Sequence, residues 1–153
     1  MDLVLWRHGE AEDWVPGCDD SQRALTPRGL KQAGRMAAWL DRQLPDGARV
    51  LVSPALRAQQ TATALGRKYK IKSELDSDAN AAQLLSIAQW PDGKGTVLIV
   101  GHQPVLGQVI AQLLGLNAND CAVKKGAVWW LRNRERESMT QTVVVTVQAP
   151  EIV

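Results

Sequence analysis

The sequence TVLIVGHQPVLGQVIAQLLG at residues 96–115 decides the fold class of this chain. Its first five residues, 96–100, form an apolar and mostly β-branched run that predicts the strongest strand of the sequence. Pro104 follows four residues later, and the apolar residues after it recur at helical spacing until Gly115, a residue that commonly ends helices. A strand followed directly by an amphipathic helix predicts a βαβ arrangement, which is the unit of α/β proteins.

The same alternation extends in both directions from this unit. We expect further strands at 3–6, 49–52, 70–75, 127–131 and 142–147, and further helices at 27–44, 54–65 and 81–90. Thr26 before Pro27, and Ser53 before Pro54, each predict a helix start, because a capping hydroxyl and a proline at the first helical position favour one. The charged segment 132–137 is expected to connect the last two strands, which can pair antiparallel. The sequence thus predicts an α/β fold with a mostly parallel sheet.

Length and composition limit the functional classes. With 153 residues and a net charge of +2, the chain is long enough for one domain with a full core and lacks the basic excess of a nucleic-acid-binding protein. Cys18 and Cys121 are isolated, match no metal spacing and favour a reducing compartment. No signal peptide or membrane-spanning run is apparent. We expect a soluble, monomeric cytoplasmic protein that has no cofactor or bound metal and does not associate with nucleic acid or membrane.

The two histidines of the chain occupy equivalent places, each directly after a predicted strand. His8 follows Arg7 at the end of the first strand, and His102 follows the strand at 96–100. Arg57 lies in the opening turn of the helix after the strand at 49–52. Ligands of open parallel sheets bind beyond the carboxyl ends of the strands, so we expect these side chains to share one cavity. Arginine and helix N-termini bind phosphate, which predicts a phosphate pocket.

A neutral histidine in such a pocket can act as a nucleophile. Neighbouring cations disfavour protonation of the imidazole and leave a nitrogen lone pair available. Neither cysteine has a thiolate-activating setting, and the chain has no serine elbow motif. We therefore expect His8 to attack phosphorus while the arginines and His102 stabilise the charge on the phosphoryl oxygens.

Four motifs in this order resemble the histidine phosphatase superfamily, and in particular its small phosphohistidine phosphatase branch. They are Arg7-His8-Gly9, Leu25-Thr26-Pro27-Arg28-Gly29 with Gln32-Ala33, Ser53-Pro54 with Arg57 and Gln60-Thr61-Ala62, and Gly101-His102-Gln103-Pro104. The resemblance implies a single domain over 1–153 with the three-layer αβα, phosphoglycerate-mutase-like fold. It also implies a phosphohistidine intermediate on His8, with Arg7, Arg57 and His102 holding the phosphate and Gly9 and Gln103 beside it.

Esterases of this superfamily use a carboxylic acid in the middle segment to protonate the leaving oxygen. The corresponding region here offers Glu74, Asp76 and Asp78 as candidate acids, but none stands in a clear acid motif. An alkoxide needs such help because it resembles hydroxide from water of pKa about 15.7, whereas the conjugate acid of imidazole has a pKa of about 6.5. We therefore expect the substrate to be phosphohistidine on a protein, for example a histidine-containing phosphotransfer domain.

Other interpretations of the same residues stay open at this stage. The histidines could be structural or could bind a metal, although adjacent arginines repel cations and no third ligand is suitably spaced. The chain could hydrolyse a small phosphate ester with one of the three carboxylates as acid. It could also be a catalytically inactive domain that binds phosphate or a phosphoprotein, although such a domain needs no nucleophile.

Overall fold

The computed structural model describes residues 1–153, and their centre is a six-stranded sheet of order β3-β2-β4-β1-β5-β6. The strands are β1 (Asp2–Arg7), β2 (Arg49–Val52), β3 (Lys70–Ile71), β4 (Thr96–Gly101), β5 (Val128–Arg136) and β6 (Met139–Gln148). The helices are α1 (Pro27–Gln43), α2 (Leu56–Thr63), α3 (Ala81–Ala88) and α4 (Val105–Leu114), with short 3-10 turns η1 (Asp20–Gln22) and η2 (Ser73–Leu75). None of the helices has both the length and the apolar character needed to cross a membrane.

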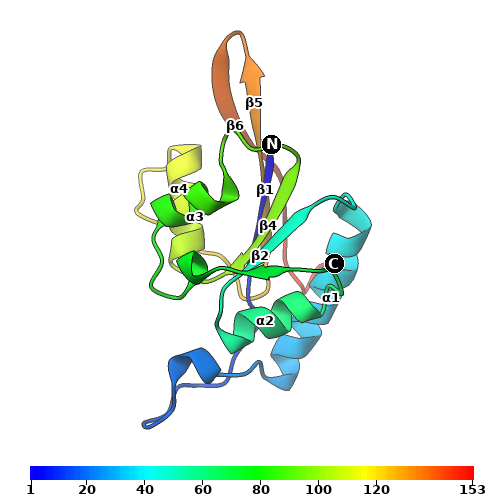
Figure 1. The fold of residues 1–153 in the computed structure, drawn as a ribbon, viewed down its shortest axis with the longest axis vertical. Helices are drawn as coiled ribbons and strands as arrows, with labels where there is room; N and C mark the ends of the chain where they lie inside the picture. Colours follow the sequence, from blue (N-terminus) through cyan, green and yellow to red (C-terminus); the bar gives the residue numbers. More distant parts are fainter.

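The sheet is mostly parallel, as the sequence predicts. Strands β3, β2, β4 and β1 are parallel neighbours, whereas β5 runs antiparallel to both β1 and β6. Helices α3 and α4 lie on one face of the sheet and α1 and α2 on the other, which gives three layers (Figure 1). The expected αβα fold class is confirmed.

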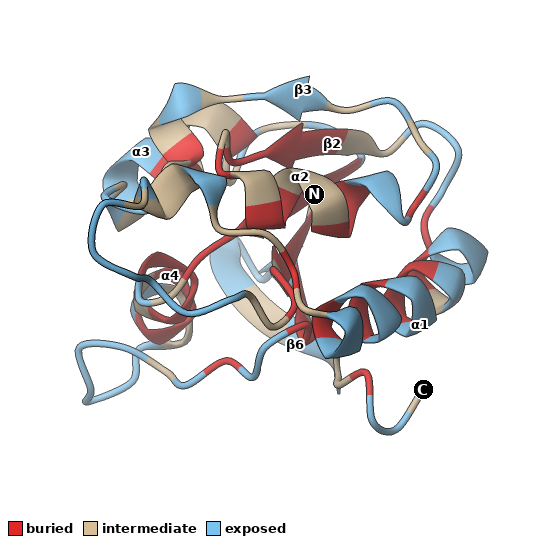
Figure 2. Cartoon of the chain, turned by 90° about the horizontal axis from the view of Figure 1, so that it is seen from below, coloured by how far each residue is buried: buried red, intermediate tan, exposed pale blue.

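Strand periodicity divides the core into two halves, because successive side chains of a strand point to opposite faces. In β1, Leu3 and Leu5 pack toward α3 and α4, while Val4 and Trp6 pack toward α1 and α2. All four side chains are fully buried. Helix α1 shows the matching pattern, with a buried inner face and an exposed outer face (Figure 2). This double burial makes the central strands rigid supports for the residues that follow them.

The second helix does not begin as the sequence predicts. Helix α2 starts at Leu56 with Ala55 at the N-cap, and no side chain caps it. The prediction of a helix start at Ser53-Pro54 is wrong, because the Ser53 hydroxyl lies 2.7 Å from the His102 ring and accepts the Ala55 amide at 3.2 Å instead. The predicted strand at 70–75 is also too long, since β3 ends at Ile71 and η2 follows.

The last two strands form a long hairpin that projects beyond the helices (Figure 1). The charged residues 132–136 belong to β5, so the prediction of a turn at 132–137 is wrong except at its end. The turn consists of Glu137 and Ser138, with φ of 53° and 63°. Two consecutive residues with positive φ match the right-handed twist of a two-residue hairpin. Charged side chains are compatible with this strand because the projecting part of β5 is exposed.

Candidate active site

The site lies where β1, β2 and β4 end at the same edge of the sheet. Arg7 is the last residue of β1 and pairs with Gly101, the last residue of β4, so that His8 and His102 follow as neighbours. The His8 amide donates to the Gly101 carbonyl at 3.1 Å. The two imidazole rings lie 5.1 Å apart, centroid to centroid, with 60° between their planes. Parallel pairing therefore brings together two residues that are 94 positions apart in the sequence.

The two rings open into a cavity of about 210 Å³ that is strongly polar. Its lining consists of Arg7, His8, Ala11, Asp13, Arg23, Arg57, Ser77, His102, Gln103 and Lys125. Four of these side chains are cationic and one is a carboxylate. The charge and size suit a small anion such as a phosphoryl group.

The His8 ring is held in a defined tautomer. Its Nδ1 lies 2.7 Å from the carbonyl oxygen of Gly9, and a carbonyl oxygen can only accept. The proton of the neutral ring is therefore on Nδ1, which leaves the lone pair on Nε2. The Gly9 amide donates to Thr61 Oγ1 at 3.1 Å, and the amide of Glu10, in the same peptide as the Gly9 carbonyl, donates to Gln32 Oε1 at 2.8 Å. Helices α2 and α1 thus fix the backbone that orients the ring.

Ser53, the residue after β2, positions the second imidazole. Its Oγ lies 2.7 Å from Nε2 of His102, and both residues are buried. Because Oγ also accepts the Ala55 amide at 3.2 Å, its own hydrogen is available to the ring nitrogen. A hydroxyl that donates to Nε2 places the His102 proton on Nδ1, which can then donate to a ligand.

The two arginines of the cavity have buried donors that no protein atom satisfies. Nη1 of Arg7 donates to the Val123 carbonyl at 2.7 Å, and Nη1 of Arg57 donates to the Asp20 carbonyl at 2.8 Å. Nε of each guanidinium is buried and has no hydrogen-bond partner in the protein. Buried unpaired donors are rare and costly. Backbone carbonyls thus hold the two guanidinium groups beside the cavity, although each keeps one unsatisfied donor.

The carboxylate of Asp20 also binds Arg57. Asp20 lies in the turn η1 before α1, whereas Arg57 lies in the first turn of α2. Asp20 Oδ2 lies 3.1 Å from Nη2 of Arg57, and Oδ1 lies 2.8 Å from Nε of Arg23. The Arg23 hydrogen bond lowers the pKa of Asp20, and the charge of Arg57 lowers it further. Asp20 thus pairs with Arg57 at the edge of the cavity as a charged carboxylate.

Both histidines are neutral over the physiological pH range. Burial lowers the pKa of His8 to about 3, and the charges of His102, Arg57 and Arg7 act in the same direction against the Gly9 hydrogen bond. Burial and Arg57 lower the pKa of His102 to about 4, while the carboxylates of Asp76 and Asp20 raise it in part. A neutral imidazole has the free lone pair that nucleophilic attack requires.

The remaining expected site residues take different places. Gln103 lines the cavity, but its amide is already bonded, because Nε2 donates to the Cys121 carbonyl and Oε1 accepts the Gly107 amide. The candidate acids Glu74, Asp76 and Asp78 are absent from the cavity lining, to which their segment contributes Ser77. Asp76 accepts the Ser77 amide at 2.8 Å. The carboxylate that does line the cavity is that of Asp13.

Sequence reasoning missed several residues that line the cavity, Asp13, Arg23 and Lys125, and two that hold its side chains, Ser53 and Asp20. Ser53 was expected to cap a helix, and Asp13, Asp20, Arg23 and Lys125 gave no signal. These four residues come from irregular segments, where no periodicity shows which side chains point inward. Only the close spacing of Asp13, Asp20 and Arg23 to the Arg-His-Gly motif links three of them to the site.

Comparison with known proteins agrees with this geometry. The model of the histidine phosphatase superfamily (branch 1) matches residues 3–83. The chain is 32% identical to the phosphohistidine phosphatase SixA of Escherichia coli K12 over 121 residues, which cover 74% of each protein. It is 33% identical to the phosphohistidine phosphatase SixA homolog of Haemophilus influenzae over 130 residues, which cover 75% of this chain and 78% of the homolog.

Solved structures show the same likeness along the whole chain. The structure of the protein histidine phosphatase SixA complexed with tungstate superposes with a TM-score of 0.79 and 26% identity. The superposition covers 98% of this chain and 97% of that one. From the matched sequence model, the relatives and the shared fold, this chain belongs to the histidine phosphatase superfamily.

Proposed function

We propose that this protein is a phosphatase that hydrolyses phosphohistidine through a covalent phosphohistidine intermediate on its own His8. One observation carries the proposal: His8, with its ring proton on Nδ1 and its lone pair on Nε2, lines one small cavity together with Arg7, Arg57 and His102. Relatives named phosphohistidine phosphatase and a similar structure with bound tungstate, a tetrahedral oxyanion, support it.

In the first step His8 displaces the substrate imidazole. The lone pair of Nε2 forms a bond to phosphorus while the bond from phosphorus to the substrate nitrogen breaks, and its electron pair stays on that nitrogen. The Gly9 carbonyl, 2.7 Å from Nδ1, stabilises the positive charge that develops on the His8 ring. In the second step the oxygen of a water molecule forms a bond to phosphorus while the bond from phosphorus to Nε2 breaks, and its electron pair returns to Nε2. The protons of the water leave with inorganic phosphate, and neutral His8 is restored.

Arg7, Arg57 and His102 stabilise the transferring group. Charge spreads over three phosphoryl oxygens during the transfer, and fixed donors in a buried cavity are effective there. The two arginines supply guanidinium N–H groups, and His102 supplies Nδ1–H because Ser53 occupies its Nε2. Hydrogen bonds within the protein hold all three side chains before the substrate arrives. The side chains therefore rearrange little when the phosphoryl group is transferred.

The cavity suits a nitrogen leaving group better than an oxygen one. The substrate imidazole, protonated on its other ring nitrogen, leaves as a neutral molecule and needs no acid from the enzyme. The one carboxylate that lines the cavity belongs to Asp13, an exposed residue, and none of the three candidate acids lines the cavity. Hydrolysis of a small phosphate ester is therefore the weaker alternative.

Exposed apolar residues beside the cavity favour a protein as the carrier of the phosphohistidine. Trp14 and Val15 follow the cavity residue Asp13, and each is 55% exposed. The indole N–H of Trp14 donates to the Cys18 carbonyl at 2.9 Å, which fixes an exposed aromatic ring at the rim. Fixed aromatic side chains are common anchors of protein interfaces.

The same proposal includes a monomeric state and a cytoplasmic location. Cys18 and Cys121 are free thiols, as is usual in a reducing compartment. A phosphotransfer domain that displays its phosphohistidine on a helix is a suitable partner.

The experiment is a rapid-quench search for the intermediate. The protein is mixed with a radiolabelled, histidine-phosphorylated phosphotransfer domain and quenched in base, which preserves phosphohistidine. We expect acid-labile, base-stable label on the protein, together with release of inorganic phosphate. His8→Ala should abolish both while keeping the thermal unfolding midpoint near that of the parent protein.

The chain offers an internal check because it has two histidines. Label that persists in His8→Ala must lie on His102 and would refute the assignment of the nucleophile. Faster turnover of sugar or glycerate phosphates than of phosphohistidine would favour the esterase alternative. Binding of phosphate without label or turnover would favour the inactive binding domain.

A further inference from the structure

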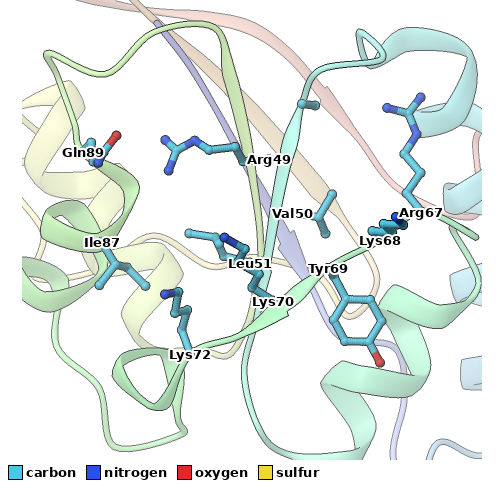
Figure 3. Close-up of a pocket in the computed structure, with 11 residues that line it drawn as sticks. Arg49, Val50, Leu51, Arg67, Lys68, Tyr69, Lys70, Lys72, Ile87 and Gln89 are labelled. Carbon is cyan, nitrogen blue, oxygen red and sulfur yellow. The ribbon is translucent and has the colours of Figure 1, made fainter.

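A second, larger cavity of about 640 Å³ lies at the β3 edge of the sheet. It is bounded by β2, by the segment 67–72 and by the end of α3 (Figure 3). We call it the sheet-edge cleft, and its lining consists of Ala48, Arg49, Val50, Leu51, Arg67, Lys68, Tyr69, Lys70, Lys72, Ile87 and Gln89. None of these residues lines the catalytic cavity, so the two sites are separate.

The cleft exists because β3 is too short to cover β2. The two strands pair only at Leu51 with Lys70 and at Val52 with Ile71. Beside Arg49 and Val50 the segment before β3 separates from the sheet. Helix α3 also ends early, at Ala88, so the corner of the sheet between them stays open.

Strand periodicity places three cations on one face of this corner. Arg49 is two residues from Leu51, Lys70 is in register with Leu51, and Lys72 is two residues beyond Lys70. Side chains at these positions share a face of the sheet. Figure 3 shows the Arg49 guanidinium extending toward Gln89, with Lys72 near Ile87. β3 is the edge strand and both of its residues are exposed, so no helix covers Lys70 and these cations are open to a ligand.

The cleft carries five basic residues and no carboxylate. Arg67 is bound to Asp41 at 3.1 Å, and Arg49 donates to the Ala88 carbonyl at 2.9 Å. Lys68, Lys70 and Lys72 take part in none of the ion pairs of the chain. Like charges gathered in a cavity repel one another, and an anionic ligand relieves that repulsion.

The cleft also has apolar surface beneath the cations. Leu51 is buried in its floor on the face that carries Lys70, and Ile87 is half-buried at its side. A ligand that uses both features has a flat ring for the apolar surface and several phosphates for the lysines. A volume of about 640 Å³ falls within the range of about 300–1,000 Å³ typical of small-molecule sites.

We propose that the sheet-edge cleft binds a nucleoside triphosphate, with its phosphates on Lys70 and Lys72 and its base against Leu51 and Ile87. This site is independent of the proposed phosphatase reaction, because the two cavities share no residue. A variant that loses phosphatase activity can therefore still be tested for nucleotide binding, and a variant that loses nucleotide binding can still be tested for phosphatase activity.

Isothermal titration calorimetry with ATP, and in parallel with inorganic tripolyphosphate, tests the proposal. Lys70→Glu/Lys72→Glu should weaken ATP binding at least about tenfold, which corresponds to about 1.4 kcal/mol. Lys31→Glu/Lys94→Glu makes the same change of charge at two exposed positions outside the cleft and should bind ATP as the parent does.

Two further variants locate the ligand. Arg57→Ala removes a phosphate-binding group of the catalytic cavity and should leave ATP affinity unchanged. Ile87→Ala should weaken ATP binding and leave tripolyphosphate binding unchanged. The proposal is overturned if the parent protein does not bind ATP, if binding survives the double lysine variant or is lost in Arg57→Ala, or if tripolyphosphate binds as tightly as ATP.

Discussion

The backbones of Gly9 and Gly29 touch, so that a Cβ placed on Gly9 would lie 2.6 Å from the Gly29 carbonyl oxygen. Gly9 follows the proposed nucleophile and Gly29 lies in the first turn of α1. Two of the sequence motifs that carry the family resemblance are thus in direct contact at their glycines. The contact places α1 against the loop whose carbonyl orients the His8 ring.

Substitution of Gly29 by alanine should destabilise the fold and impair the site. A Cβ there would overlap the Glu10 backbone, and overpacking of this kind costs about 1–3 kcal/mol. Gly34 in the same helix is the matched control, because its Cβ would meet nothing within 4 Å. Gly34→Ala should stabilise the protein by up to about 1 kcal/mol through helix propensity. Urea unfolding measures both, and equal effects would contradict the packing argument.

Neither histidine should titrate near neutral pH in the free protein. Burial lowers the pKa of His8 to about 3 and that of His102 to about 4, below the ordinary 6.5. The chain has two histidines, so its NMR spectrum should contain two imidazole Hε1–Cε1 signals that stay constant from pH 7.5 to 5.5. A signal that moves with a midpoint near 6.5 would contradict the neutral, buried site.

The same pKa values predict how stability depends on pH. In the unfolded chain both histidines take up a proton as the pH falls below about 6.5, whereas the folded protein does so only near 3 to 4. The unfolded state therefore binds more protons in this window, and the free energy of unfolding should fall between pH 6.5 and 4. Urea unfolding of the parent and of His8→Gln/His102→Gln should show a shallower fall in the variant.

Ser53 should act as a positioning residue for His102. Ser53→Ala removes the hydroxyl 2.7 Å from Nε2, so the ring loses its defined tautomer. We expect kcat to fall at least about tenfold, or about 1.4 kcal/mol, with a smaller change in KM. The His102 NMR signal should shift as well, and Ser53→Thr should restore both. Ser86→Ala, at an exposed position of α3, should change neither.

Trp14 should matter for a protein substrate and not for a small one. Trp14→Ala removes an exposed ring beside the cavity without touching the residues that line it. We expect kcat/KM for a phosphorylated phosphotransfer domain to fall about tenfold, a typical loss for an interface anchor, and kcat/KM for phosphoramidate to stay unchanged. Met139→Ser, at the exposed tip of the hairpin, is the control. An equal loss on both substrates would contradict a docking role.

Asp20 should compete with phosphate for Arg57. Its Oδ2 lies 3.1 Å from Nη2 of Arg57, so Asp20→Asn removes a negative charge from the edge of the anion site. Inhibition by vanadate should become about threefold to tenfold tighter. Asp41→Asn removes a carboxylate at the same 3.1 Å distance from Arg67 and should leave vanadate inhibition unchanged. Weaker inhibition in Asp20→Asn would show that Asp20 mainly holds Arg57 in place.

The sequence alone predicts the central strands and most helices well. Apolar runs at β1, β2 and β4 are long and uninterrupted, and α1 begins at Pro27 after a capping threonine as expected. Local signals fail where contacts from elsewhere decide the conformation. Ser53 bonds a histidine rather than capping α2, and the charged residues of β5 are tolerated because that strand projects into solvent.

What the sequence by itself determines is the order of elements and the placement of Arg7, His8, Arg57 and His102 at their ends, because periodicity and turn residues act over short distances. Only the tertiary structure decides three contacts of the site. The Gly9 carbonyl accepts a hydrogen bond from His8 Nδ1, the Ser53 hydroxyl bonds His102 Nε2, and Asp20 forms an ion pair with Arg57. Those contacts depend on strand register and on the path of irregular segments. Both are set by packing between distant residues, which no local pattern encodes.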